Sequence, residues 1–159
     1  MTRRFRTIPV LSLSLLLLSA AAFAAEKPDF TGEWTLNAAK SDFGPMPAPE
    51  KLIRKIDHKD PDLKITTTSA SQGNERTNES AYKTDGSESV NKYGQAEAKS
   101  IVKWEGSNLT IATKREIQGM TIEQNEKWTL SEDGKTLTVD GNIKAPQGEL
   151  ALKMVMDKK

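Results

Sequence analysis

Three polar side chains stand where the surrounding pattern predicts the interior of the protein: Arg115, Gln124 and Glu126. A guanidinium in an interior is costly unless a carboxylate pairs with it or an anion binds to it. One alternative is therefore an internal salt bridge between Arg115 and Glu126. The other is a clamp in which Arg115 holds the carboxylate of a ligand through two hydrogen bonds, assisted by Gln124. A strand register that slips by one residue would instead put all three in water.

Catalytic chemistry has little support in the sequence, because His58 is the only histidine and cysteine is absent. His58, Asp60 and a serine could form a hydrolytic triad, but no nucleophile elbow or oxyanion hole is recognisable. We expect His58 to be a surface residue at a strand end. Histidine pairs and an Asp-rich calcium loop are both missing, so we predict no metal site and no cofactor. The sequence favours a non-catalytic protein and leaves acid–base work by Glu126 and Arg115 open.

Short β-strands must position these side chains, since apolar and polar residues alternate with a period of two between turn residues. Ten strands are predicted, at residues 30–36, 52–58, 63–69, 77–83, 89–92, 96–104, 109–117, 121–130, 137–143 and 150–156. Turn signals such as Asp85-Gly86, Gln118-Gly119 and Asp133-Gly134 join them closely, and short connections make neighbouring strands antiparallel. Such a sheet has to hide its edges. We therefore predict an all-β, up-and-down antiparallel meander that closes into a barrel of about 8–10 strands.

The inward face of the last five predicted strands changes character along the barrel. Two layers that contain Trp104 and Trp128 are large and apolar, which predicts a packed end. The third layer is predicted to hold Ser100, Thr113, Glu126, Gly141 and Leu152, and the fourth Ala98, Arg115, Gln124, Ile143 and Leu150. Smaller and polar residues in these layers leave space for a small ligand. The candidate pocket residues are Ser100, Thr113, Arg115, Gln124, Glu126 and Gly141.

Residues 1–24 are typical of a signal peptide, with three arginines, an apolar run at 8–18 and the triplet Ala22-Phe23-Ala24. Residues 25–159 then form one domain, which we expect in the bacterial periplasm or outside the cell. Without those arginines the chain carries 20 basic and 22 acidic residues, a formal charge of −2. This balance argues against a nucleic-acid partner. No segment after the signal peptide is apolar enough to cross a membrane.

The tetrapeptide Thr31-Gly32-Glu33-Trp34 resembles the Gly-x-Trp opening of the lipocalins and their calycin relatives. The wider stretch from Asp29 to Phe43, DFTGEWTLNAAKSDF, is similar to uncharacterised bacterial secreted proteins with a lipocalin-like barrel. The resemblance implies a lipocalin-like barrel with Trp34 packed in its closed end and a lipophilic pocket at its open end. The residues assigned to the structural core are Gly32, Trp34, Trp104 and Trp128.

Two functions follow from these observations. The first is an exported non-catalytic binding protein that holds a small hydrophobic or carboxylate-bearing ligand, such as a lipid or fatty acid, inside the barrel. The second is a plugged barrel that acts through its surface as a cell-envelope interaction or inhibitor protein. In that case the proline-rich loop at residues 37–50, which presents Phe43 and Met46, would dock onto a protein partner. An internal space beside Arg115 would favour the first function.

Overall fold

The computed structural model describes residues 27–159, so the predicted signal peptide lies outside the described residues. Ten strands follow one another: β1 (Gly32–Leu36), β2 (Lys51–Lys59), β3 (Asp62–Ser71), β4 (Asn74–Lys83), β5 (Glu88–Tyr93), β6 (Ala96–Glu105), β7 (Asn108–Ile117), β8 (Met120–Leu130), β9 (Thr136–Ala145) and β10 (Gly148–Lys158). A short 3-10 turn, η1 (Ala38–Lys40), follows β1. Residues 27–159 contain no helix of the length and apolar character that a membrane crossing needs.

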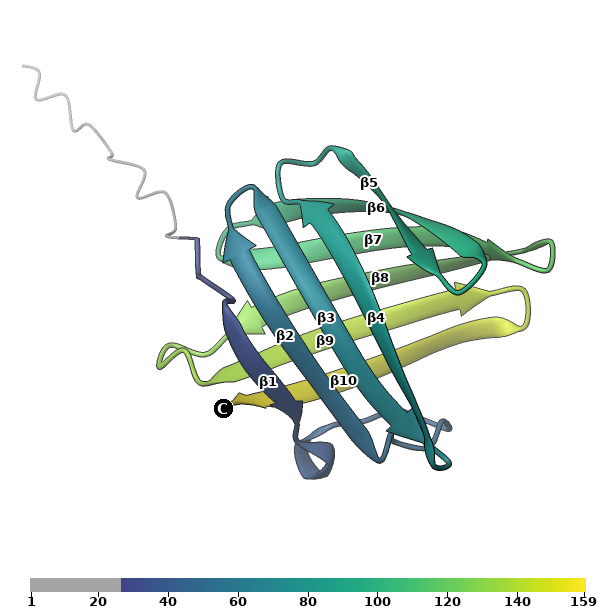
Figure 1. Ribbon diagram of the computed structural model, residues 1–159, viewed down its shortest axis with the longest axis horizontal. Coiled ribbons are helices and arrows are strands. Elements are labelled where there is room, and N and C mark those ends of the chain that lie inside the picture. Colours follow the sequence, from purple (N-terminus) through teal and green to yellow (C-terminus); the bar gives the residue numbers. More distant parts are fainter. Residues whose placement is uncertain (1–26) are drawn as a thin grey trace, which may run out of the picture.

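The strands form one antiparallel sheet in the order β4-β3-β2-β1-β10-β9-β8-β7-β6-β5. Because β1 pairs with both β2 and β10, the first and last strands are neighbours and the sheet curls into a nearly closed barrel (Figure 1). The predicted all-β up-and-down meander with barrel closure is confirmed. Period-two alternation produced this fold, since each ladder buries one face and leaves the other in water.

The two ends of the sheet, β4 and β5, meet without a backbone ladder, and we call this line the β4–β5 seam. The amide of Asn91 replaces the ladder at one point. Its oxygen accepts from the Ala81 N–H at 2.7 Å, and its nitrogen donates to the Ala81 carbonyl at 3.1 Å. The Ser89 hydroxyl accepts from the Lys83 N–H at 3.1 Å. Side chains, rather than main chain, thus join the edges of the barrel.

Aromatic side chains fill the barrel end where β1 begins, and we call it the packed end. Phe30, Trp34 and Trp128 are almost fully buried there. The Phe30 ring stacks on partly buried Trp104, with centroids 6.0 Å apart, and meets Trp128 edge-on at 5.7 Å. The Trp34 indole donates to the Phe30 carbonyl at 2.9 Å. This polar contact orients the indole, so the packed end has a defined arrangement rather than a loose apolar fill.

Gly32 makes room for a cation above Trp34. The Lys158 ammonium lies 5.1 Å from the Trp34 ring centroid, which is cation–π geometry. A Cβ on Gly32 would come within 2.6 Å of the Lys158 side chain, and the φ of Gly32 is +147°. The Gly-x-Trp spacing therefore has a local physical reason: the glycine opens the space through which Lys158 reaches the indole.

We expect Gly32→Ala to lower the free energy of unfolding by about 1–3 kcal/mol, because it strains the backbone and displaces Lys158. The control is Gly106→Ala, which also has a positive φ, +63°, but has open space around its Cβ. Urea denaturation of both variants checks the prediction. A Gly32 variant no less stable than the Gly106 variant would contradict it.

The register between β7 and β8 differs from the predicted one by two residues. Arg115 pairs with Ile122, and Thr113 with Gln124, whereas the sequence layers placed Arg115 beside Gln124. The cause is the turn between these strands: Gln118 and Gly119 have φ values of +52° and +78° and form a two-residue loop, shorter than the one assumed. Because the shift is even, the same side chains still face inward.

Candidate functional site

A cavity of about 140 Å³ lies inside the barrel, between the wall formed by β2 to β5 and the wall formed by β7 and β8. Its lining mixes charged, hydroxyl and aromatic groups. The lining residues are Arg54, Ile65, Thr67, Asn78, Ser80, Tyr82, Tyr93, Ile111, Thr113, Arg115, Gln124, Glu126 and Trp128. Most of these side chains are polar, and only Ile65, Ile111 and Trp128 are apolar. Polar groups that converge on one interior cavity make it the candidate site for a small molecule.

Four of the six candidate pocket residues, Thr113, Arg115, Gln124 and Glu126, line this cavity. Ser100 is the partner of Thr113 on the neighbouring strand β6, and its hydroxyl hydrogen-bonds to that of Thr113 at 2.8 Å. Gly141 does not line the cavity, although it pairs with Glu126 in the ladder between β8 and β9. A Cβ at Gly141 would meet the Leu152 side chain at 2.7 Å, so this glycine accommodates Leu152.

Glu126 is held by three partners inside the barrel. One carboxylate oxygen accepts from the Gln124 amide at 2.7 Å, and the other accepts from the Trp128 indole at 2.7 Å. Its ion-pair partner is Arg54, with 3.8 Å between Nη1 and Oε2, and the Arg54 guanidinium lies over the Trp128 ring at 5.2 Å. The salt bridge that the sequence offered between Arg115 and Glu126 is therefore not formed. The sequence held a signal for Arg54, because it shares one face of β2 with the apolar residues Leu52 and Ile56 and should therefore point inward.

Arg115 makes no side-chain hydrogen bond or ion pair within residues 27–159, although its Nε is buried. Its guanidinium carbon lies 5.9 Å from the ring centroid of Tyr93. Arg54 likewise has two buried nitrogens, Nε and Nη1, without a hydrogen-bond acceptor. Two guanidinium groups with unused donors thus line one cavity. Because unpaired buried donors are costly, this arrangement suits an anion that accepts from them.

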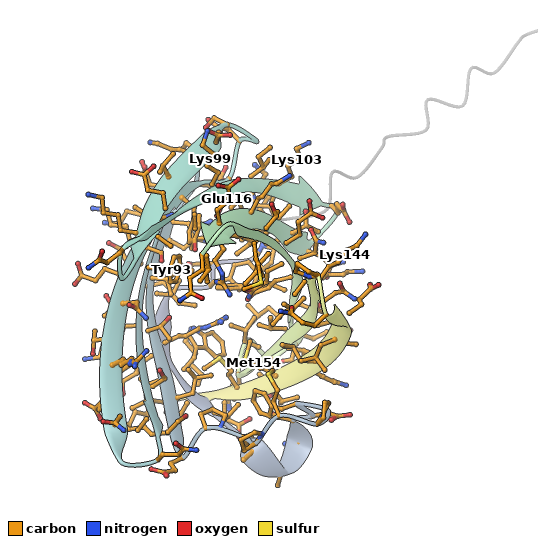
Figure 2. All side chains as sticks on the ribbon, turned by 90° about the vertical axis from the view of Figure 1, so that its right-hand side faces the viewer. Tyr93, Lys99, Lys103, Glu116, Lys144 and Met154 are labelled. Atoms are coloured by element: carbon orange, nitrogen blue, oxygen red, sulfur yellow. The ribbon has the colours of Figure 1, made fainter. Side chains whose placement is uncertain are left out.

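Three hydroxyl groups cross the β4–β5 seam beside this cavity. The Tyr93 hydroxyl bonds to Ser80 at 3.0 Å and to Tyr82 at 3.2 Å. Burial, with the neighbouring Tyr93, raises the pKa of Tyr82 well above its usual value. Tyr93 and Met154 lie on the inner side of the strands, and Lys99, Lys103 and Lys144 extend from the outer side (Figure 2). Sequence reasoning missed this hydroxyl cluster, since a strand pattern does not reveal which edges meet.

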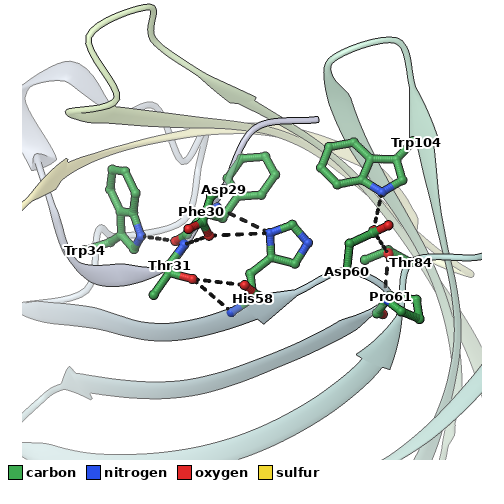
Figure 3. A network of polar contacts seen from close by, with 9 residues as sticks. All are labelled: Asp29, Phe30, Thr31, Trp34, His58, Asp60, Pro61, Thr84 and Trp104. Carbon is green, nitrogen blue, oxygen red and sulfur yellow. Dashed lines mark hydrogen bonds and ion pairs between the residues drawn. The ribbon is translucent and has the colours of Figure 1, made fainter. Parts of the chain in front are cut away.

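His58 is buried between aromatic rings, so the expected surface position was wrong. Its ring centroid lies 5.8 Å from that of Phe30 and 5.7 Å from that of Trp104. Nδ1 accepts from the Phe30 N–H at 3.4 Å (Figure 3). Burial lowers the pKa of His58, against the opposing fields of Asp29 and Asp60. No serine hydroxyl contacts His58 among the described residues, and those residues hold no cluster of three or more metal-ligating side chains.

Asp60 links three segments at the packed end, and Figure 3 shows its contacts with Thr84 and Trp104. Its carboxylate accepts from the Lys27 ammonium at 2.9 Å, from the Trp104 indole at 2.9 Å and from the Thr84 hydroxyl. The hydrogen bonds from Lys27, Thr84 and Trp104 lower the pKa of Asp60 to about 2. Since a depressed carboxyl pKa favours the folded state only while the group is ionised, Asp60 stabilises the fold above its unfolded pKa.

We expect this stabilisation to be lost as the pH falls from about 4 to about 2, the interval between the unfolded and folded pKa values of Asp60. Asp60→Asn should therefore be less stable than the wild type at pH 5, with a smaller further loss towards pH 2. Urea denaturation across this range checks the prediction. The control is Asp62→Asn, whose carboxylate pairs with Lys83 in the open. Equal acid sensitivity in the Asp60 variant and the wild type would contradict it.

The proline-rich loop at residues 37–50 starts along the edge of β10. The Asn37 N–H donates to the Val155 carbonyl at 2.8 Å, and Asp42 and Lys153 exchange two backbone hydrogen bonds at 2.8 and 2.7 Å. Phe43 packs against the core. Met46, further along, is 41% exposed. The first half of the loop is thus attached to the barrel by backbone pairing.

No protein-family model matches the sequence, and the search of curated proteins found no significant match. Solved structures do share the fold. The zebrafish ileal bile acid-binding protein complexed with cholic acid is 21% identical, with a TM-score of 0.58, and the match covers 82% of this chain and 98% of that one. A fatty acid transporter is 12% identical, with a TM-score of 0.55 and coverages of 82% and 96%. Human cRBP IV is 18% identical, with a TM-score of 0.54 and coverages of 83% and 99%. At these identities the likeness shows a shared barrel fold.

Proposed function

We propose that the protein is a non-catalytic binding protein that holds a carboxylate-bearing small molecule in the barrel cavity. The observation that carries this proposal is Arg115, a guanidinium on the cavity wall whose buried Nε has no acceptor. Glu126 does not neutralise it, because that carboxylate is engaged by Gln124, Trp128 and Arg54. A ligand carboxylate would satisfy the guanidinium by bidentate hydrogen bonding.

The solved structures of the same fold support this choice of ligand class. One of them was determined with cholic acid, and another is named a fatty acid transporter. Both molecules carry a carboxylate on an apolar body. We further propose that the signal-like residues 1–24 export the protein, so that it meets its ligand in the periplasm or outside the cell.

The test compares binding by the wild type and by Arg115→Met. Benzoate, octanoate and hexadecanoate are titrated, each alongside its uncharged primary amide. Binding is measured calorimetrically and by tryptophan fluorescence, to which Trp128 in the cavity wall contributes. We expect at least one carboxylate to bind more tightly than its amide, and Arg115→Met to weaken that binding by about 10- to 100-fold.

Lys114→Met is the matched control, because it removes the same charge from the neighbouring, outward-facing residue, which pairs with Glu123 at 3.4 Å. It should leave binding unchanged. The proposal fails if none of the three carboxylates binds, or if the Arg115 and Lys114 variants behave alike.

A further inference from the structure

We propose that the ligand is a compact monocarboxylate, with one ring or a short chain, rather than a long-chain fatty acid or a dianion such as a phosphate ester. This inference rests on the proposed function and narrows its ligand class. Two independent properties of the cavity support it: its volume and the sum of the charges on its wall.

The volume limits how much of a ligand the barrel can enclose. The cavity holds about 140 Å³. A protein cavity of about 150 Å³ takes one benzene ring, whereas sites for drug-sized molecules span roughly 300–1,000 Å³. A carboxylate on a single ring or a short chain therefore fills the space, and a chain of sixteen carbons is too long to be enclosed in it.

The surrounding packing explains why the space is short. Towards the packed end the buried rings of Trp128, Phe30 and Trp34 occupy the barrel. Leu152 fills the room that Gly141 leaves beside Glu126, on the neighbouring strand β9. Lengthening the cavity would require these side chains to move, which is costly because protein interiors are close-packed.

The charge on the wall sets the preferred charge of the ligand. Arg54 and Arg115 carry two positive charges, and Glu126 carries one negative charge that is held by two hydrogen bonds. The remaining ionisable lining groups, Tyr82 and Tyr93, are hydroxyls bonded to each other. One ligand carboxylate therefore neutralises the net charge of the cavity lining. A dianion would leave one buried negative charge uncompensated beside Glu126.

The aromatic groups of the wall suit a planar acid. The two guanidinium groups are backed by rings, Arg54 by Trp128 at 5.2 Å and Arg115 by Tyr93 at 5.9 Å. Ring contacts hold each guanidinium in place while its remaining donors stay available. A carboxylate attached to an aromatic ring can accept hydrogen bonds from a guanidinium group and place its ring against Ile65 and Ile111, which line the same cavity.

The experiment titrates the wild-type protein with benzoate, hexadecanoate and phenyl phosphate at pH 7.5, below the critical micelle concentration of the fatty acid. We expect benzoate to bind about tenfold or more tightly than phenyl phosphate, because Glu126 in the lining repels the second negative charge of phenyl phosphate. Hexadecanoate should bind more weakly than benzoate by about tenfold, because it gains little contact for the core rearrangement that it requires.

Two variants test whether the bound acid occupies the cavity. Thr67→Phe should fill the space, since Thr67 lines it, and abolish benzoate binding. Thr66→Phe is the matched control, because the adjacent strand position faces the other side of the sheet. Circular dichroism confirms that both variants are folded. Loss of binding in the first variant alone supports the inference.

The outcomes separate the two proposals. Tighter binding of hexadecanoate or phenyl phosphate than of benzoate overturns the compact monocarboxylate while leaving the carboxylate-binding function in place. Equal benzoate binding by both threonine variants overturns it as well. The absence of binding by any carboxylate overturns the proposed function itself and this inference with it.

Discussion

Glu126→Gln is expected to lower the free energy of unfolding by about 3–5 kcal/mol, the cost of removing one partner from a buried ion pair. The side chains of Glu126 and Arg54 are 9% and 12% exposed, so water screens them poorly. A glutamine at this position has one acceptor oxygen for two donors, the Gln124 amide and the Trp128 indole. The substitution would therefore leave the Arg54 guanidinium without its ion-pair partner and one hydrogen-bond donor without an acceptor.

Urea denaturation measures the change, and Glu123→Gln is the control. Glu123 is three residues away on the outer face, 47% exposed, and pairs with Lys114. Removing that surface pair should change stability by no more than about 1 kcal/mol. If the Glu126 and Glu123 variants are equally stable, the buried contacts of Glu126 stabilise the fold no more than a surface ion pair does.

The same substitution should change the charge preference of the cavity. With Glu126 neutral, Arg54 and Arg115 leave two positive charges on the wall, so phenyl phosphate should gain affinity relative to benzoate. The two dissociation constants, measured for wild type and variant, check this. An unchanged ratio would show that Glu126 does not contribute to the field at the ligand.

Trp34→Ala is expected to lower the free energy of unfolding by about 3–5 kcal/mol, the usual cost of deleting a buried large aromatic side chain. Trp34 is fully buried in the packed end, its indole donates to the Phe30 carbonyl at 2.9 Å, and Lys158 covers its face. Domains of this size have about 5–15 kcal/mol of stability, so the variant should show a sharply lowered melting temperature.

Two further variants separate packing from hydrogen bonding at this position. Trp34→Phe keeps most of the apolar contact but removes the donor to Phe30, so it should cost about 1–3 kcal/mol. Thr35→Ala, the next residue on the opposite face of β1, is the control and should have a much smaller effect. Thermal unfolding followed by circular dichroism gives all three values. A Trp34→Ala variant as stable as Thr35→Ala would show that the Trp34 side chain in the packed end contributes little to the stability of the fold.

Most of the fold could be predicted from local patterns, because strand alternation and turn residues act over a few residues. All ten predicted strands overlap the observed ones. The register between β7 and β8 could not be fixed in this way, since Gln118 adopts a positive φ that glycine adopts more readily. His58 shows the opposite case: the alternation of Ile56 and His58 pointed inward, but its position near a turn suggested the surface.

The candidate site was predictable in part, for a physical reason. Arg115, Gln124 and Glu126 share an inward face because pleating fixes the side of each residue. The partner of Glu126 is Arg54, which lies on β2, far along the chain. Which distant walls face each other depends on how strongly the closed sheet is tilted and sheared, and this is a property of the whole barrel.

The β4–β5 seam is a line along which the barrel can open at a small cost in free energy. Asn91, Ser89 and Tyr93 hold the two edges through side-chain contacts, each worth about 0.5–1.5 kcal/mol. Parting there breaks none of the ladders that define the sheet. The two strand edges can therefore separate while the rest of the sheet stays paired. Tyr93, which lies against Arg115, both joins these edges and forms part of the cavity wall, so a molecule that passes through the seam would contact it.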